Sequence, residues 1–135
     1  MANIAWTDKK ELDSKAIEAA RVSKLNELKA ACTNAVYEGF QSEVTGHQFG
    51  FNELDQTNFN QQATLIALSG GVQSYTGEIK WKTKSGSVVQ LSPAQFINVI
   101  EEAKDHKVHQ QEKYWTLEVQ LNSAGTVEEI QAITW

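Results

Sequence analysis

EIKWKTKSGSVVQLSPAQFINVIEEAKDHKVHQQEKYWTLEVQL, residues 78–121, contains the two signals that decide the fold. Its first part alternates apolar residues with lysines, which is typical of a strand with one buried face. A three-residue loop, Lys84-Ser85-Gly86, with Gly86 in the left-handed region would pair Trp81 with Val89 on the returning strand. A two-residue loop would separate the apolar side chains. We therefore predict the three-residue loop, because it gathers them on one face.

A long helix is expected directly after this hairpin. Ser92 is a good N-cap, and Pro93 suits the first helical position because its missing N–H needs no partner there. Apolar residues then continue at helical spacing, which predicts a helix over 92–121. A second apolar stripe lies about 100° round the C-terminal half of this helix and consists of Val108, Trp115 and Val119. One neighbouring helix would hardly cover both stripes.

A first long helix is predicted from Thr7 or Asp8 to about Phe40 or Ser42. Apolar residues recur there at steps of three and four: Leu25, Leu28, Cys32, Val36 and Phe40. A helix of this length spans roughly 50 Å and therefore needs a long partner. That partner is the 92–121 helix in antiparallel packing, other copies of the chain, or both.

Shorter elements are expected between and after the long helices. Alternation over 47–51 predicts a third strand, and Asp55, Thr57 or Asn58 can cap a helix that ends before Gly70. The sequence from Thr126 to Glu129 forms a capping box that opens a short final helix. An antiparallel arrangement would bring this final helix near Trp6.

The predicted fold class is α+β, with two long antiparallel helices. A small antiparallel sheet of about three strands and a short helix lie at one end, and the short C-terminal helix lies at the other. We expect a single domain over 1–135, with the first helix in 1–45, the sheet and short helix in 46–91, and the second long helix and terminal helix in 92–135.

Composition narrows the function classes. The 135 residues are 41% hydrophobic and 21% charged, and we expect neither a signal peptide nor a membrane span. A single cysteine gives no disulfide framework and no cysteine zinc site. The net charge of −5 argues against a general nucleic-acid binder. Three lysines on one side of a strand read as a solvated face that guards a sheet edge, or as a phosphate site: Lys80, Lys82 and Lys84.

No motif points to catalysis, a cofactor or a resident metal. His106 and His109 lie three residues apart on a helix, but no third ligand is evident near them. They read as solvent-facing or interface histidines, and a trimer packed along this helix could bring symmetry-related copies together around an ion. The adjacent glutamate pairs at 101–102 and 128–129 point apart, so they read as surface residues. We expect that the protein is not an enzyme.

The order of features from about Leu25 to Trp135 carries a family resemblance. The features are a Leu- and Ala-rich helix ending near Gly39-Phe40, then Gly46-His47-Gln48-Phe49, the run from Asp55 to Phe59, Trp81 in a short hairpin, Leu91 before a helix with Phe96 and His106, and a closing run from Ala124 to Ile130. This pattern resembles an uncharacterised domain family of tailed bacteriophages, found in tail, tail-fibre and tail-fibre-assembly proteins. About 24 residues precede the match. The family has no established catalytic residues.

The resemblance implies a non-enzymatic tail or tail-fibre-associated structural protein of the virion, present in the host cytoplasm during assembly. Its partners would be other tail or tail-fibre proteins and further copies of itself, a trimer being one arrangement, without nucleic acid or membrane insertion. An assembly chaperone absent from the mature virion and a host-surface receptor-binding module are the alternatives. The candidate protein-contact residues are Leu25, Leu28, Val36, Val108, Trp115, Val119, Trp81 and Tyr75. The last two belong to a second surface at the sheet, with Phe49 and Phe51.

Overall fold

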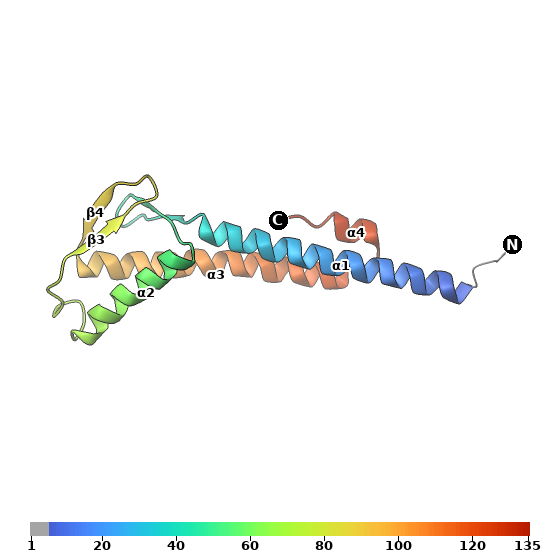
Figure 1. Ribbon diagram of the computed structural model, residues 1–135, viewed down its shortest axis with the longest axis horizontal. Helices are drawn as coiled ribbons and strands as arrows, with labels where there is room; N and C mark the ends of the chain where they lie inside the picture. Colours follow the sequence, from blue (N-terminus) through green and yellow to red (C-terminus); the bar gives the residue numbers. More distant parts are fainter. Residues whose placement is uncertain (1–5) are drawn as a thin grey trace. The chain divides into compact units, whose positions relative to one another are not determined.

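A computed structural model describes residues 6–135, and the side chains from residue 9 onward (Figure 1). The elements are α1 (Trp6–Tyr37), β1 (Phe40–Gln41), β2 (Gln48–Phe49), α2 (Glu53–Leu68), β3 (Ile79–Lys82), β4 (Val88–Leu91), α3 (Pro93–Ser123) and α4 (Val127–Gln131). The predicted α+β class with two long helices is confirmed. The expected proximity of Trp6 to the final helix concerns a side chain outside the described ones. No helix among the described residues has the length and apolarity needed to cross a membrane.

The chain forms two compact units, and both long helices contribute to each. The helical unit consists of the chain up to Thr33 together with Gln111–Trp135. The mixed unit is Asn34–Gln110 and contains all four strands and α2. Each unit has a hydrophobic core of its own.

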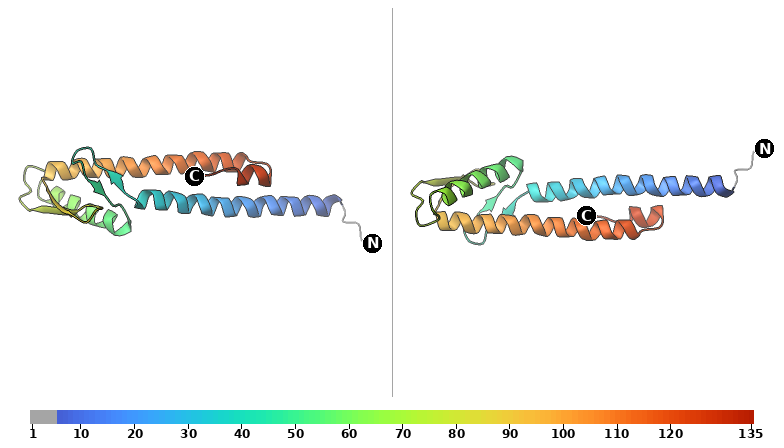
Figure 2. Two further views of the ribbon diagram at one scale, coloured as in Figure 1. Left: turned by 90° about the horizontal axis from the view of Figure 1, so that it is seen from above. Right: turned by 90° about the horizontal axis from the view of Figure 1, so that it is seen from below.

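The helical unit is built from α1, the end of α3, and α4. Figure 2 shows α4 beside both long helices in this unit. Arg21 lies beside the last turns of α3, and Cys32 lies near Tyr114 two turns earlier in α3, so the two helices run antiparallel within this unit. Five apolar side chains form its buried core: Leu28, Leu121, Ala124, Ile130 and Ile133.

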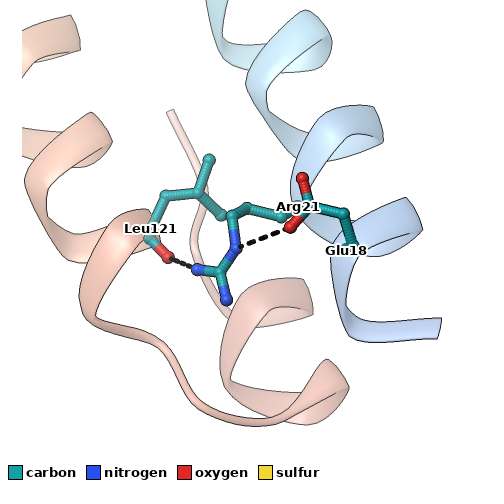
Figure 3. A network of polar contacts seen from close by, with 3 residues as sticks. All are labelled: Glu18, Arg21 and Leu121. Atoms are coloured by element: carbon teal, nitrogen blue, oxygen red, sulfur yellow. Dashed lines mark hydrogen bonds and ion pairs between the residues drawn. The ribbon is translucent and has the colours of Figure 1, made fainter. Parts of the chain in front are cut away.

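A polar contact satisfies a backbone carbonyl group in the last turn of α3. The Arg21 guanidinium donates from Nη1 to the Leu121 carbonyl oxygen at 2.6 Å, and its Nε lies 3.7 Å from Glu18 Oε2 (Figure 3). A cation suits this position because the last carbonyls of a helix have no partner within the helix. Thr126 caps the next helix as predicted, since its Oγ1 accepts the Glu129 N–H at 3.1 Å. The predicted capping box is not completed, because Glu129 Oε2 accepts the Gly125 N–H at 2.8 Å.

The mixed unit packs aromatic rings from the hairpin, α2 and α3 together. Trp81 lies with its ring centroid 4.6 Å from that of Phe59 and 5.0 Å from that of Phe96. Such tilted aromatic pairs contribute beyond the area that they bury. The buried core consists of Val36, Phe49, Phe51, Phe59, Ile66, Ile79, Leu91, Phe96, Val99 and Ala103.

The hairpin has the predicted register. Trp81 pairs with Val89, and Gly86 has a φ of 95°, as the three-residue loop requires. The predicted start of the second long helix is also confirmed. Ser92 Oγ accepts the Gln95 N–H at 3.1 Å, while Gln95 Oε1 accepts the Ser92 N–H at 2.9 Å. These reciprocal bonds satisfy two amides at the start of α3.

The strands form two ribbons instead of one sheet of about three strands. β1 pairs with β2, and β3 pairs with β4, each antiparallel. A single backbone hydrogen bond, from Lys84 N–H to the Gln48 carbonyl at 2.8 Å, links the two ribbons. The strand expected at 47–51 is therefore the shorter β2, and its partner is a strand that the sequence pattern assigned to a helix.

Two helix boundaries also differ from the expected ones. α1 ends at Tyr37, short of Phe40, because Gly39 takes a φ of 91° and turns the chain into β1. α2 begins at Glu53 with Asn52 as its cap, in place of the caps expected at Asp55, Thr57 or Asn58. Asn52 Oδ1 accepts the Asp55 N–H at 2.8 Å, and Asp55 Oδ2 accepts the Asn52 N–H at 3.0 Å. Asp55 therefore completes the capping box from inside the helix.

Candidate interaction surface

The exposed apolar side chains of α3 in the helical unit are the main candidate for a contact surface. Trp115 is 52% exposed and Val119 is 65% exposed. They are four residues apart on one helix, so their side chains lie on the same face. A single exposed apolar residue is ordinary, but a tryptophan adjacent to a valine gives a larger apolar area. We call this pair the α3 patch.

These two side chains are exposed because α3 has more apolar surface than its neighbours cover. The stripe with Tyr114, Leu117 and Leu121 faces the core of the helical unit. The α3 patch lies one and two positions beyond this stripe, and thus on another side of the helix. The predicted broad apolar arc is therefore only partly buried within the chain.

The predicted contact residues of the first long helix are mostly structural. Leu28 is 1% exposed in the core of the helical unit, and Val36 is 3% exposed in the core of the mixed unit. Leu25 is half-buried and packs against the first of these cores. Their stripe is apolar, as predicted, but it packs against segments of the same chain. Elsewhere on α1, Leu12 is 56% exposed and Val22 is 51% exposed.

The remaining predicted contact residues lie in the mixed unit. Val108 is half-buried on α3. Trp81 is half-buried and packs on Phe59 and Phe96, and the hydroxyl of Tyr75 accepts a hydrogen bond from Gln62 Nε2 at 3.1 Å. Neither aromatic ring projects freely from the ribbons, and Phe49 and Phe51 are buried.

The two histidines of α3 occupy different environments. His106 is half-buried, and its Nε2 lies 3.2 Å from the Val36 carbonyl oxygen, with its ring 6.0 Å from that of Phe40. A carbonyl only accepts, so Nε2 carries the proton and donates. His109 is exposed. Within residues 6–135, no group of three or more His, Cys, Asp or Glu side chains could hold a metal ion.

Glu102 has a role that the sequence pattern missed. Its Oε1 accepts the hydroxyl proton of the fully buried Ser42 at 2.6 Å, and its Oε2 accepts the Glu43 N–H at 2.7 Å. Ser42 Oγ in turn accepts the Thr45 N–H at 3.2 Å. The carboxylate therefore fixes the turn between β1 and β2. Only a contact about sixty residues apart in sequence reveals this role, and the local pattern of an adjacent glutamate pair does not contain it.

We expect Tyr114 to ionise at a higher pH than a tyrosine of the unfolded chain. Burial, together with the hydrogen bond to Glu118 Oε2 at 3.0 Å and the charge of that carboxylate, raises the pKa of Tyr114 to about 12. A tyrosine of the unfolded chain has a pKa near 10. The stability that neutral Tyr114 contributes is therefore intact below about pH 10 and is lost as the pH rises towards 12. Ultraviolet difference titration should show a late phase that Tyr114→Phe removes and Tyr37→Phe retains. Loss of the late phase in Tyr37→Phe instead would refute the assignment.

The described residues form an α+β fold with two long helices, and no group of three or more His, Cys, Asp or Glu side chains among them could hold a metal ion. Residues 19–134 match the family described as "Domain of unknown function (DUF4376)", and the chain belongs to this family. No curated protein and no solved structure matches the chain.

Proposed function

We propose that this protein is a non-enzymatic structural component of a bacteriophage tail or tail fibre, and that it acts by protein–protein assembly. The observation that carries the assembly role is the exposed α3 patch, Trp115 and Val119. Tryptophan is enriched among the residues that dominate interface energetics, because it buries a large area with few rotatable bonds. The virion attribution is supported by the sequence resemblance described above, and the family description itself names no function.

Self-association is the first part of the proposal to test. Light scattering on the purified chain should give a molar mass of two or more protomers. The double variant W115A/V119A should weaken this association by about tenfold or more, as expected for truncation of a central tryptophan. The matched control is T116A/Q120A, which changes two exposed residues at the same spacing on the neighbouring face of α3. Equal effects of the two double variants would refute a role for the α3 patch.

Retention in the particle is the second part. Mass spectrometry should detect the chain in purified virions at a stoichiometry comparable with known tail components. Presence in infected cells but absence from virions would overturn the structural role and favour an assembly chaperone. A chain that is monomeric but binds another tail protein through the α3 patch would refute self-association. The same result would still support assembly with a partner protein.

A further inference from the structure

One edge of the β3–β4 ribbon is open over two residues. In an antiparallel pair, the backbone N–H and C=O groups of successive residues point alternately to the partner strand and away from it. Thr83 donates its N–H to the Ser87 carbonyl oxygen at 2.7 Å, and Trp81 pairs with Val89, so these two residues face β4. The backbone groups of Lys80 and Lys82 therefore face the other way.

The same edge already accepts a backbone partner at its far end. Lys84 is the next residue of the outward-facing set, and its N–H donates to the Gln48 carbonyl oxygen of β2 at 2.8 Å. Gln48 pairs with Gln41 of β1, and the next pair along is joined by the hydrogen bond from Ser42 N–H to the His47 carbonyl. Because hydrogen-bonded and non-hydrogen-bonded pairs alternate, the backbone groups of Gln48 point away from β1. This edge of the β3–β4 ribbon is thus joined to β2 by one backbone hydrogen bond.

A groove lies along the open part of the edge. Its volume is about 370 Å³, within the range of ligand pockets in proteins. Residues of β3 form one wall, and one side of α2 forms the other, with Asp55, Asn58, Gln62 and Leu65 among its side chains. All of these residues belong to the mixed unit. The Asp55 carboxylate is held by the Asn52 N–H at the start of α2.

We propose that this groove binds an extended segment of another protein, which adds to β3 as a third strand. Main-chain hydrogen bonds to Lys80 and Lys82 would provide affinity, as in other cases of strand addition to a sheet edge. An added strand would also bring the ribbon beyond the two strands that are marginal by themselves.

Charge and polarity define the occupant. The side chains of Lys80 and Lys82 are exposed on the face opposite Trp81, so residues of the added strand on that face are acidic. Glu78 lies 3.5 Å from Lys80 Nζ, but this pair is exposed and is therefore weak. On the other face, the added side chains meet Trp81 and Leu65 beside the polar side chains Asp55, Asn58, Gln61 and Gln62 of α2, so the positions that pack on Trp81 and Leu65 are apolar. The ligand is thus a segment of alternating acidic and apolar residues.

The lysines also exclude a second copy of β3 as the occupant. Antiparallel pairing of Ile79–Lys82 with itself would place lysines beside lysines, and like charges directly across a strand pair are destabilising. The same feature discourages non-specific edge pairing, as lysines on natural edge strands do. This inference does not depend on the proposed virion role, because the groove and the α3 patch share no residue and its test uses an isolated peptide.

The test uses a short synthetic peptide of alternating glutamate and valine at neutral pH. We expect saturable binding to the full chain by fluorescence anisotropy, and slower exchange of the Lys80 and Lys82 amide protons by NMR. Absence of saturation up to about 1 mM peptide, or protection confined to other surfaces, would overturn the proposal. The variant K80E/K82E should weaken binding by at least about tenfold. The control K9E/K10E makes the same change in net charge on exposed residues of α1 and should leave binding unchanged.

Backbone methylation of the peptide separates strand pairing from simple charge attraction. Methylation of the glutamate amides should abolish binding if the added strand is antiparallel, because those amides then face β3. In a parallel arrangement the valine amides face β3, and their methylation should abolish binding instead. Full binding by both methylated peptides would show that only charge is recognised, and would overturn the proposal.

Discussion

Replacing Gly39 with alanine should lower the free energy of unfolding by about 3 kcal/mol or more. Gly39 has a φ of 91°, a conformation that costs other residues about 1–2 kcal/mol. In addition, an added Cβ would overlap the Phe49 carbonyl oxygen and would lie 2.8 Å from the Gly50 Cα. Both of these are backbone atoms of β2 or its extension, so relief of the strain requires the backbone at Gly39 to move away from β2. Urea denaturation followed by circular dichroism measures the loss.

Gly46 provides the matched control for this substitution. It also has a positive φ, of 76°, but nothing lies within 4 Å of the position that a Cβ would occupy. Gly46→Ala should therefore cost only the conformational strain, about 1–2 kcal/mol. Equal losses in the two variants would contradict the close approach of Gly39 to β2.

Replacing Phe96 with alanine should cost about 3–5 kcal/mol. Phe96 is fully buried, and its ring centroid lies 5.7 Å from that of Phe59 as well as close to Trp81. Truncation would leave a cavity between the hairpin, α2 and α3, and would also remove aromatic contacts. Urea denaturation followed by circular dichroism measures the loss in the free energy of unfolding.

Two further variants make the Phe96 result interpretable. Phe96→Leu retains most of the apolar volume and should cost clearly less than Phe96→Ala. Leu68→Ala removes a side chain that is 78% exposed on α2 and should change stability by no more than about 0.5 kcal/mol. A loss in Phe96→Ala no larger than that in Leu68→Ala would contradict the packing of this core.

Sequence reasoning succeeded where the signal was local. The register of the hairpin followed from Gly86 and from the alternation around Trp81, and the start of α3 followed from Ser92 and Pro93. These features depend on residues within a few positions of each other, so turn and capping chemistry decides them. The Asn52 cap of α2 could also have been predicted, since Asp55 follows Asn52 by three residues, the spacing of a capping box.

The features that were missed depend on distant partners. Phe40 continues the apolar stripe of the first helix, yet it belongs to β1 because it pairs with Phe49. The role of Glu102 depends on Ser42, and the burial of Leu28 depends on α4 at the other end of the chain. Periodicity identifies a face as apolar, but it does not tell whether that face meets the same chain or another one. For this reason the contact set contained both core residues and exposed ones such as Trp115.

The two-stranded ribbons have a consequence for biosynthesis. A two-stranded ribbon is marginal in water without a surface to pack on, and here that surface includes Phe96, Val99 and Ala103 of α3. Translation proceeds from the N-terminus, so Phe49 and Ile79 leave the ribosome before the helix that shields them. During that interval the nascent chain carries uncovered apolar segments, and factors that hold growing polypeptides have their best opportunity to engage it there.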